Sequence, residues 1–313
     1  MLNAAIIGLG WWGRTLVESV QSNSKRFHFT RAATLDTEAV ASFAQQHGIH
    51  VVHDIEEVLA DPAIEAVVLA TPHSLHVRHI IAAAKAGKHV FSEKPLALNL
   101  ADAQRAVAAC DDAGVVLAVG QTERFNPALA AARPLITDPR FIVVHRLGTF
   151  PERSLDIDVV FDLMIHDLDA VLSLVDSDVE SLEAVGVPVI TNRVDIANAR
   201  LRFANGCIVN LTASRISRDR VRKIRFFQPS AYVSIDWATQ KVEVYRLVKG
   251  SGPAPSIEGG ELEVVNEEPL KRELADFVDA VVARRAPVVT GEAGRRALSV
   301  AQAIVDKMAA NVR

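Results

Sequence analysis

Lys94 is the residue whose type and surroundings first point to chemistry. It lies in the segment Phe91-Ser92-Glu93-Lys94-Pro95, where a short apolar run ends. The proline restricts Lys94 to extended backbone and so fixes where its ammonium group points. Such a group can donate to a substrate oxygen or, if burial lowers its pKa, act as a base. A solvated loop lysine is the ordinary alternative.

A glycine-rich turn near the start predicts a dinucleotide site. The apolar run that begins at Leu2 leads into Gly8-Leu9-Gly10-Trp11-Trp12-Gly13 and then into an amphipathic stretch. In such a GxGxxG motif the first glycine permits a tight turn, the second lets the backbone approach a pyrophosphate, and the third lets the helix pack on the strand. The helix N-terminus then faces the anion. A glycine turn without a ligand remains the alternative.

Asp36 favours NAD as the cofactor. It ends the next apolar run, 23 residues after Gly13, close to the spacing of about 20 residues at which an acid accepts hydrogen bonds from the adenosine ribose. A carboxylate there repels a 2′-phosphate, and Thr37 follows it instead of an arginine. We therefore expect NAD, with NADP less favoured. Asp36 can also act as a helix N-cap.

Strands and helices alternate through the first half and place these groups at one edge of a sheet. The expected strands are 2–8, 27–35, 50–52, 64–70, 89–92 and 115–120, and the expected helices are 14–22, 38–47, 55–60, 74–86 and 100–113. This pattern predicts an α/β Rossmann domain over 1–122 with a doubly wound parallel sheet. Ligands bind at the carboxyl ends of such strands, which adds Thr71, Pro72 and His73. His76 and His79 follow at helical spacing, although each can equally lie on a solvated helix face.

The second half, 123–313, changes to strands after a polar connector at 121–127. The expected strands are 141–147, 182–189, 196–203, 207–214, 222–227, 231–236 and 241–248, with Asn205-Gly206 as a hairpin turn. They predict an α+β domain with an open, largely antiparallel sheet, one face of which needs cover. The stretch 250–260, rich in Gly, Pro and Ser, predicts a surface loop. Two helices, 270–283 and 294–310, follow it.

One helix, 159–174, is expected between the first two of these strands. Asp162, His166, Asp169 and Ser173 share a narrow polar stripe on it, and the rest is mostly apolar. The stripe is either a solvated face or the wall of a cleft. Asp162 and His166 are also spaced as a pair of helical metal ligands. No third or fourth ligand stands at a recognisable spacing, so no metal site is predicted.

These motifs together resemble the Gfo/Idh/MocA family of nicotinamide-dependent sugar and polyol dehydrogenases. The resemblance rests on Gly8-x-Gly10-x-x-Gly13, Asp36, Thr71-Pro72 with His76, Asp162-x-x-x-His166 and, above all, Glu93-Lys94-Pro95. It implies that Lys94, Asp162 and His166 are catalytic. The cofactor contacts that it implies are Gly8, Gly10, Trp11, Trp12, Gly13, Asp36, Thr71, Pro72, His73, His76, Glu93, Lys94 and Gln121. The implied substrate contacts are Lys94, Arg124, Asn126, Asp162 and His166.

The resemblance also implies an assembly. In the family such a C-terminal sheet mediates homo-oligomers, so we expect a dimer or tetramer. The final helices, about 270–313, are expected to pack back on the first domain.

Two departures from the family pattern narrow the choice of substrate. Asp156-Ile157-Asp158-Val159-Val160-Phe161 and Met164 stand where members often have glycines. The sequences Arg124-Phe125-Asn126-Pro127 and 162–167 are closer to the nucleotide-sugar branch, which favours a nucleotide-linked hexosamine over free inositol or glucose. A basic segment agrees, because arginine forks suit a pyrophosphate. It comprises Arg215, Arg218, Arg220, Arg222, Lys223 and Arg225. A solvated loop is the alternative for most of these.

The expected reaction is hydride transfer from a secondary hydroxyl of the sugar to NAD. The hydroxyl proton must leave at the same time, which requires a base near the operating pH. His166 is the natural candidate, with Asp162 orienting it and Lys94 donating to the substrate oxygen. The sequence leaves open whether His166 or Lys94 is the base. Alternatives are a free-polyol dehydrogenase, an NADPH-linked reductase and a non-catalytic NAD-binding sensor.

Bulk composition excludes some partners. A chain of 313 residues with net charge -4 and a pI near 6.2 lacks the basic character typical of nucleic-acid or membrane-surface binding. Cys110 and Cys207 lie far apart in apolar patterns, which predicts core residues in a reducing compartment. The sequence opens without a basic leader or a long apolar run, so we expect a cytoplasmic protein.

Overall fold

The computed structural model describes residues 1–21, 24–150, 157–248 and 256–310. Contacts divide the chain into two compact units, Met1–Thr122 with Glu268–Leu298, and Glu123–Glu267 with Ser299–Arg313. We call these the first and second units. Part of the predicted loop at 250–260 lies outside the described residues, and so does Asp156. No helix in the described ranges is long and apolar enough to cross a membrane.

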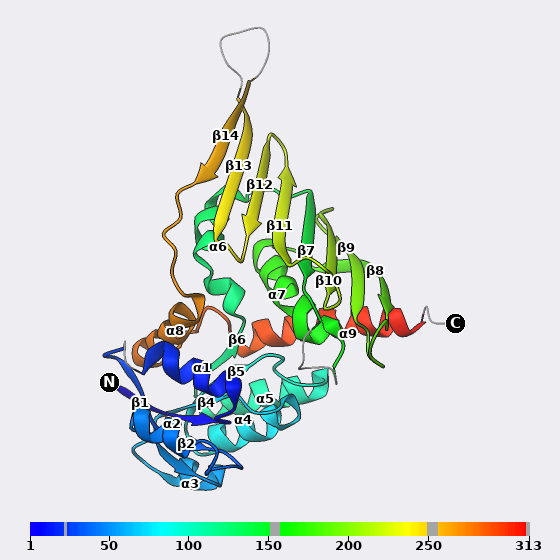
Figure 1. The fold of residues 1–313 in the computed structure, drawn as a ribbon. Coiled ribbons are helices and arrows are strands. Elements are labelled where there is room, and N and C mark those ends of the chain that lie inside the picture. Colours follow the sequence, from blue (N-terminus) through cyan, green and yellow to red (C-terminus); the bar gives the residue numbers. More distant parts are fainter. Residues whose placement is uncertain (22–23, 151–156, 249–255, 311–313) are drawn as a thin grey trace. The chain divides into compact units, whose positions relative to one another are not determined.

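The first unit contains a six-stranded parallel sheet in the order β3-β2-β1-β4-β5-β6 (Figure 1). The strands are β1 (Leu2–Ile7), β2 (Phe27–Ala33), β3 (His50–Val52), β4 (Ala66–Leu69), β5 (His89–Glu93) and β6 (Leu117–Gly120). The helices between them are α1 (Trp11–Val20), α2 (Ala41–His47), α3 (Ile55–Ala60), α4 (His76–Lys85) and α5 (Leu100–Ala113). This strand order is that of a doubly wound dinucleotide-binding sheet, which confirms the predicted Rossmann fold.

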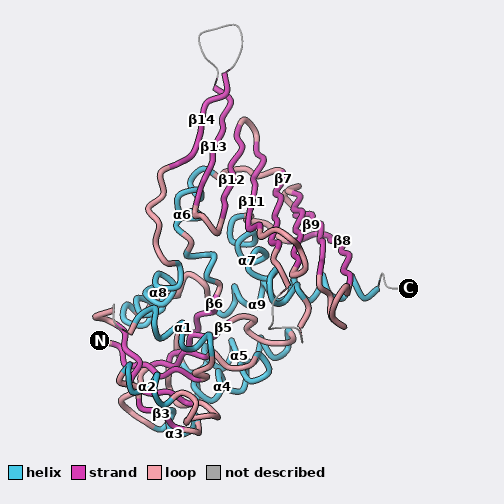
Figure 2. The backbone as a smooth tube through the Cα atoms, in the orientation of Figure 1, coloured by secondary structure: helices cyan, strands magenta, loops and turns pink. Residues whose placement is uncertain are grey.

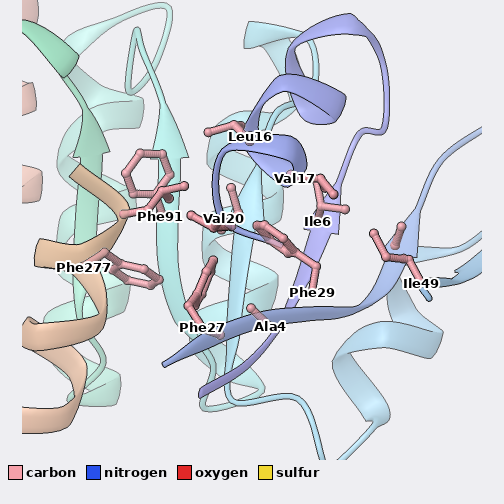
Figure 3. Packing of buried hydrophobic residues seen from close by; sticks show 14 of the residues in the cluster. Ala4, Ile6, Leu16, Val17, Val20, Phe27, Phe29, Ile49, Phe91 and Phe277 are labelled. Atoms are coloured by element: carbon pink, nitrogen blue, oxygen red, sulfur yellow. The ribbon is translucent and has the colours of Figure 1, made fainter. Parts of the chain in front are cut away.

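A late helix completes the core of this unit. Helix α8 (Pro269–Ala283) places Phe277 edge-on against Phe27 and Phe91, with ring centroids 6.5 and 5.9 Å apart (Figure 3). Leu270 and Leu274 from the same helix are also buried in this cluster. Edge-to-face aromatic contacts contribute about 0.5–1.5 kcal/mol each beyond their buried area. The sheet therefore needs residues from both stretches of chain to close its core.

The second unit contains an eight-stranded sheet in the order β14-β13-β12-β11-β7-β10-β9-β8 (Figure 2). The strands are β7 (Phe141–Leu147), β8 (Val179–Val187), β9 (Ile196–Phe203), β10 (Ile208–Ser214), β11 (Val221–Gln228), β12 (Ala231–Asp236), β13 (Lys241–Val248) and β14 (Ser256–Leu262). Only β7 and β10 pair in parallel; every other neighbouring pair is antiparallel. The expected largely antiparallel sheet is confirmed, with the parallel β7–β10 pair as an addition, and Gly206 turns the β9–β10 hairpin with a φ of +87°.

The two faces of this sheet differ. Buried residues alternate along the central strands, as in Ile142 and Val144 on β7, and define an inner face. Helix α6 (Pro127–Ala132) packs against β12 and β13. On the opposite, outer face an aromatic row runs through Phe141, Phe227, Tyr232 and Tyr245, with neighbouring centroids 5.3–6.2 Å apart. Phe227 and Tyr245 are about two-fifths exposed.

In this region the structure adds one α-helix to the predicted elements and corrects two predictions. The polar connector 121–127 leads into α6, a helix that was not among the predicted elements, and the Asn126 side chain caps it. Residues 256–260 were predicted as loop, but they belong to β14. Glycine is required there because a Cβ on Gly259 would lie 1.9 Å from the Val244 carbonyl oxygen. Helix α9 (Gly291–Ala310) begins three residues before the predicted start at 294.

Candidate active site

The glycine turn of the first unit separates a folding role from a binding role. Gly8 has a φ of +94°, and a Cβ there would lie 2.7 Å from the Ala70 carbonyl oxygen. A Cβ on Gly13 would lie 2.0 Å from the Gly8 oxygen. Gly10, the N-cap of α1, has nothing within 4 Å of its Cβ position. Gly8 and Gly13 are therefore required by packing, whereas Gly10 leaves space at the helix N-terminus, where an anion is favoured.

Asp36 follows β2 at the same edge of the sheet and is exposed. Its Oδ1 atom accepts a hydrogen bond of 2.9 Å from the backbone N–H of Ala39. This contact fixes the carboxylate and leaves Oδ2 able to accept from a ligand hydroxyl. Asp36 therefore caps a turn, and the predicted helix N-cap is wrong because α2 begins at Ala41 with Val40 at its N-cap. Ribose binding through Oδ2 stays a prediction.

Glu93 ends β5 with its carboxyl group buried, 8% exposed. It pairs with Gly120 on β6, and a Cβ at Gly120 would lie 3.0 Å from the Glu93 carboxylate. Burial raises the pKa of Glu93 to about 7, against the opposing effects of Trp12 and Lys94. Lys94 follows, half-buried, with a cis peptide bond to Pro95. A carboxyl group that changes charge near neutral pH therefore stands beside the predicted catalytic lysine.

His76 has a different place from the one predicted. It is fully buried, with Nδ1 2.9 Å from the Pro95 carbonyl oxygen and Nε2 3.0 Å from that of Thr71. Burial lowers its pKa to about 4, so the ring is neutral near pH 7. A neutral imidazole has one N–H, so only one carbonyl receives a hydrogen bond at a time. The expected direct contact of His76 with the cofactor is inconsistent with this burial; the residue braces the ends of β4 and the Glu93-Lys94-Pro95 segment.

Several buried polar atoms at this edge lack a partner among the described residues. They are Nε1 of Trp12, Oε1 of Glu93 and both amide atoms of Gln121. Such atoms are nearly always paired in folded proteins. The three residues belong to the set expected to bind the cofactor, and they offer the mixture of donors and acceptors that a nicotinamide nucleotide can satisfy. The residues present therefore fit NAD. Trp11 and Pro72 are exposed, and His73 is half-buried with its ring edge-on to His76.

In the second unit, Asp162 and His166 lie at the junction of two helical types. Val160–Met164 form a π-helical turn, and α7 (Ile165–Leu174) continues from it. Asp162 lies in the π turn and His166 in the first turn of α7, and both are half-buried. The sequence predicted one uninterrupted helix over 159–174. π turns are rare and frequent at functional sites, so this irregularity marks the two residues as a candidate site.

A buried charge cluster fixes the helix directly after His166. Arg146 on β7 contacts both carboxylate oxygens of Asp167, through Nε at 2.6 Å and through a terminal nitrogen at 2.9 Å. The same terminal nitrogen, Nη2, donates to Glu123 at 2.9 Å. Arg146 and Asp167 are 5% and 2% exposed. Bidentate arginine pairs are geometrically specific, so this cluster sets the rotation of α7.

Arg124 and Asn126, both expected to bind substrate, have partners within the unit. Arg124 lies 3.4 Å from Asp169 on α7. Burial raises the pKa of Asp169 to about 6, against the effect of Arg124. The polar stripe predicted on this helix is therefore buried at Asp169. Asn126 is 2% exposed, caps α6 and donates to the Trp237 carbonyl oxygen at 3.1 Å, which contradicts a direct substrate contact.

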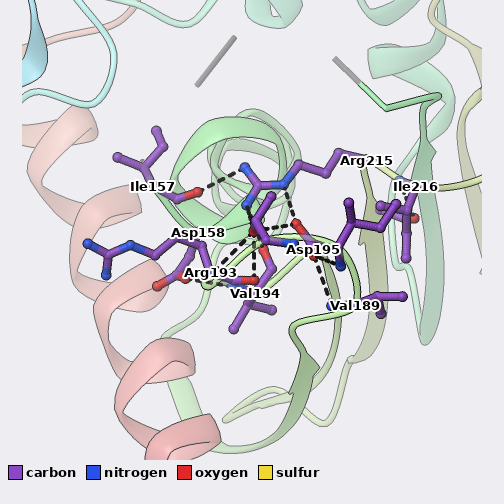
Figure 4. Close-up of polar contacts among 11 residues, drawn as sticks. Ile157, Asp158, Val189, Arg193, Val194, Asp195, Arg215 and Ile216 are labelled. Carbon is purple, nitrogen blue, oxygen red and sulfur yellow. Dashed lines mark hydrogen bonds and ion pairs between the residues drawn. The ribbon is translucent and has the colours of Figure 1, made fainter. Parts of the chain in front are cut away.

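A second ion pair fixes the chain where it enters the π turn (Figure 4). Arg215 donates through Nε to Asp195 at 2.9 Å, and both side chains are at most 1% exposed. Another nitrogen of Arg215 donates to the Ile157 carbonyl oxygen at 2.9 Å. Burial opposes the charge on Asp195, but the N–H groups of residues 189–191 hold its pKa well below the usual range. Arg215 is thus structural, and the expectation that it serves a pyrophosphate is wrong.

Two family models match the chain. An oxidoreductase family with an NAD-binding Rossmann fold covers residues 2–121, and the Gfo/Idh/MocA C-terminal domain covers 144–233. UDP-N-acetylglucosamine 3-dehydrogenase from Acidithiobacillus ferrooxidans is 33% identical over 306 residues, which cover 96% of this chain and 95% of that protein. The chain belongs to the Gfo/Idh/MocA oxidoreductase family. This confirms the resemblance that the motifs indicated.

Further comparisons show how far the similarity extends. A solved structure of the Acidithiobacillus ferrooxidans enzyme superposes with a TM-score of 0.92 at 31% identity, over 99% of this chain and 98% of that one. Myo-inositol 2-dehydrogenase from Thermotoga maritima is 28% identical over 78% of each chain. Levoglucosan dehydrogenase in complex with NADH superposes at 0.88 with 21% identity, over 99% of this chain and 97% of that one. This last likeness extends to the fold alone.

Sequence reasoning missed several residues of this Gfo/Idh/MocA site. Gly120 makes room for the Glu93 carboxyl group, but its signal was only a glycine at the end of a predicted strand. The Arg146–Asp167 pair joins positions 21 residues apart, and no local spacing indicates it. Among the described residues no group of three His, Cys, Asp or Glu side chains could hold a metal ion.

Proposed function

We propose that this protein is an NAD-dependent dehydrogenase that oxidises a secondary hydroxyl of a nucleotide-linked hexosamine. One observation carries the proposal: the open Gly10 turn and the half-buried Lys94 lie at the same carboxyl edge of the Rossmann sheet. Ligands of such sheets bind at that edge. The end-to-end similarity to a UDP-N-acetylglucosamine 3-dehydrogenase supports a nucleotide sugar as substrate.

The proposed cofactor contacts follow from the polar groups of the first unit. The N–H groups at the start of α1 receive the pyrophosphate over Gly10, and Asp36 accepts from the adenosine ribose through Oδ2. Trp12, Glu93 and Gln121 supply buried donors and acceptors for the remaining polar groups. Because the Asp36 carboxylate repels a 2′-phosphate, NAD binds more tightly than NADP. When bound, NAD accepts the hydride from the substrate carbon.

The protein handles the proton of the reacting hydroxyl. We assign His166 as the base, because imidazole exchanges protons near neutral pH. Asp162 lies one turn earlier and orients the imidazole and stabilises its charged form. Lys94 donates to the substrate oxygen and favours the alkoxide-like transition state. In the second unit, the Arg146–Asp167 and Arg215–Asp195 pairs position the helix that carries Asp162 and His166. In the first unit, His76 positions the segment that carries Lys94.

We also propose that the outer face of the eight-stranded sheet is the interface through which copies of this chain form a homo-oligomer. Its aromatic row leaves Phe227 and Tyr245 partly exposed, and a second copy would cover them. Light scattering should give a dimer or tetramer, and Phe227→Asp with Tyr245→Asp should give a smaller species. A cytoplasmic location is part of the proposal, supported by two buried free thiols, Cys110 and Cys207.

The direct test is a substrate panel followed through nicotinamide absorbance. Purified protein with NAD is incubated with UDP-hexosamines, other UDP-sugars, free hexoses and polyols, and then with NADP. The expected result is NADH formation with a UDP-hexosamine and a weaker reaction with NADP. Turnover of inositol or glucose alone would replace the nucleotide sugar with a free polyol. Tight NAD binding without turnover of any substrate would favour a sensor and reject the dehydrogenase.

A further inference from the structure

The basic segment 215–225 contains four cations with side-chain partners among the described residues and two, Arg218 and Arg222, with none. Arg215 is buried against Asp195. Arg220 lies 3.3 Å from Thr149, Lys223 3.6 Å from Asp236 and Arg225 3.4 Å from His145. The Arg222 side chain makes no hydrogen bond or ion pair with any described residue, although its backbone carbonyl accepts from the Trp237 N–H at 2.9 Å. The solvated-loop interpretation therefore fails for Arg215, which is buried, whereas Arg218, Arg220 and Arg222 are exposed. Of these three, Arg222 lies within a strand.

Arg222 lies directly opposite Arg146. The two residues are register partners on the antiparallel strands β11 and β7. Arg222 has the same parity as Ile224 and Phe226, which are buried on the inner face of the sheet. Like charges directly opposite one another on a sheet are destabilising. Asp167 and Glu123 both bond to Arg146, so the compensating carboxylates are already occupied by that neighbour.

The environment of Arg222 suits an anion from solution. The side chain is crowded by protein on one side yet exposed to solvent. Partial burial and the nearby Arg146 guanidinium lower its pKa, and Glu123 and Asp167 oppose this effect. An arginine still carries its full charge at neutral pH. A ligand with two negative oxygens would compensate this charge and match the planar guanidinium fork.

This cation lies close to the helix that carries the proposed base. Arg222 is one cross-strand step from Arg146, and the Arg146 side chain bonds to Asp167, the residue after His166 in the first turn of α7. Residues directly opposite on antiparallel strands are about 4.5–5.5 Å apart. Within the second unit, a substrate with its sugar at His166 would therefore carry a neighbouring group towards Arg222.

We propose that Arg222 binds the diphosphate of the nucleotide-linked substrate and so selects nucleotide sugars over free sugars. The inference rests on the proposed function and deepens it. In a nucleoside diphosphate sugar a single ring separates the reacting hydroxyl from the diphosphate, which places the anion beside the base. Arg222 donates to the phosphate oxygens and does not contact the reacting carbon.

The test compares Arg222→Ala with Arg222→Lys and with Arg225→Ala. Arg225 is the matched control because it lies on the same strand, faces the other way and contacts His145. UDP is titrated into each protein by calorimetry, and KM and kcat are measured with the UDP-hexosamine. Loss of a charge-assisted contact should raise the Kd for UDP and the KM by about 10- to 100-fold in Arg222→Ala. Arg222→Lys should recover part of the loss, and Arg225→Ala should stay within about twofold of the wild type.

The outcomes separate this inference from the proposed function. Unchanged UDP affinity in Arg222→Ala overturns the inference, and so does a wild-type protein that binds no UDP. A kcat that falls for free sugars by the same factor would also overturn it, because that result indicates a structural role. If the wild type binds UDP through Arg222 but oxidises no sugar, the inference holds and the dehydrogenase proposal fails.

Discussion

The Nδ1 atom of His76 lies 2.9 Å from the Pro95 carbonyl oxygen, so a fully buried imidazole ties α4 to the segment that carries Lys94. The other ring nitrogen faces the Thr71 carbonyl oxygen at the end of β4. One side chain thus sets the relative positions of two neighbouring strand ends at the cofactor edge. Because it is buried, its contribution is mechanical support and not contact with a ligand.

Replacing this imidazole should weaken both the fold and catalysis. His76→Ala leaves a cavity and removes the ring N–H donor from a buried carbonyl oxygen, so the free energy of unfolding should fall by about 2–5 kcal/mol. kcat should fall as well, because Lys94 loses its support. Urea unfolding and steady-state kinetics measure the two effects. His79→Ala, one turn later on α4, is the control, and equal losses in both variants would contradict a special role for His76.

Glu93 should make stability depend on pH in the opposite sense from most acids. Its folded pKa of about 7 lies above the value of 4.5 that is usual for a glutamate side chain. Between these values the unfolded chain has released a proton that the folded chain retains, so stability falls as pH rises through this window. Without NAD, Glu93→Gln should be more stable than the wild type by up to about 3 kcal/mol at pH 8 and similar to it near pH 4.

Denaturant unfolding across that pH range measures the Glu93 effect. Glu57→Gln removes an exposed carboxylate from α3 of the same unit and serves as the control. A difference between Glu93→Gln and the wild type that stays constant from pH 4 to pH 8 would show that burial does not perturb this carboxyl group.

Gly10→Ala should separate cofactor binding from folding. Gly10 has a φ of -73°, which alanine adopts readily, and its Cβ position is open. The free energy of unfolding should therefore change by less than about 0.5 kcal/mol. The methyl group would occupy the approach of the pyrophosphate, and the Kd for NAD should rise by about 10-fold or more. Fluorescence titration measures the Kd. Gly13→Ala should instead disrupt folding, and an unchanged Kd in Gly10→Ala would place the pyrophosphate elsewhere.

Removing one partner of the Arg146–Asp167 pair should lower the free energy of unfolding more than replacing both partners with apolar residues. Asp167→Asn leaves Arg146 buried without its bidentate partner, and the expected cost is about 3–5 kcal/mol. The double variant Arg146→Met with Asp167→Leu removes both charges and should cost less than Asp167→Asn alone. Urea unfolding of the set gives these values. A double variant less stable than Asp167→Asn would mean that the pair contributes mainly attraction.

Lys94 and His166 should act on the same proton-transfer step. Lys94→Ala and His166→Ala should each lower kcat by about 100-fold, the usual scale for an acid or base group, with NAD affinity largely kept. The double variant should lose less than the product of the two factors, because groups that act on one step are not additive. Wild-type turnover in either single variant would remove that residue from the mechanism.

The first unit could be predicted almost completely, because its signals are local. The Gly8, Gly10 and Gly13 spacing and the alternation of short apolar runs with helices specify both the fold and the cofactor edge. The second unit was predicted less well. Gly259 was predicted to lie in a loop. The reason for a glycine there, the close Val244 carbonyl oxygen of β13, is seen only in the folded structure. Arg215 appeared to be a ligand for phosphate, since its partner Asp195 reaches it only through tertiary folding. The π turn at Asp162 has no sequence signature.

The assembly of the first unit from two stretches of chain constrains the order in which the protein can be made. Phe277 belongs to the core around Phe27 and Phe91, yet the whole of the second sheet is translated before it. During synthesis, part of the apolar surface of the first unit therefore stays exposed until the second sheet has been translated and α8 follows it. Such a nascent chain depends on chaperones or on rapid folding of the second unit to avoid aggregation. It also follows that residues 1–122 expressed alone would lack the helix that closes their core.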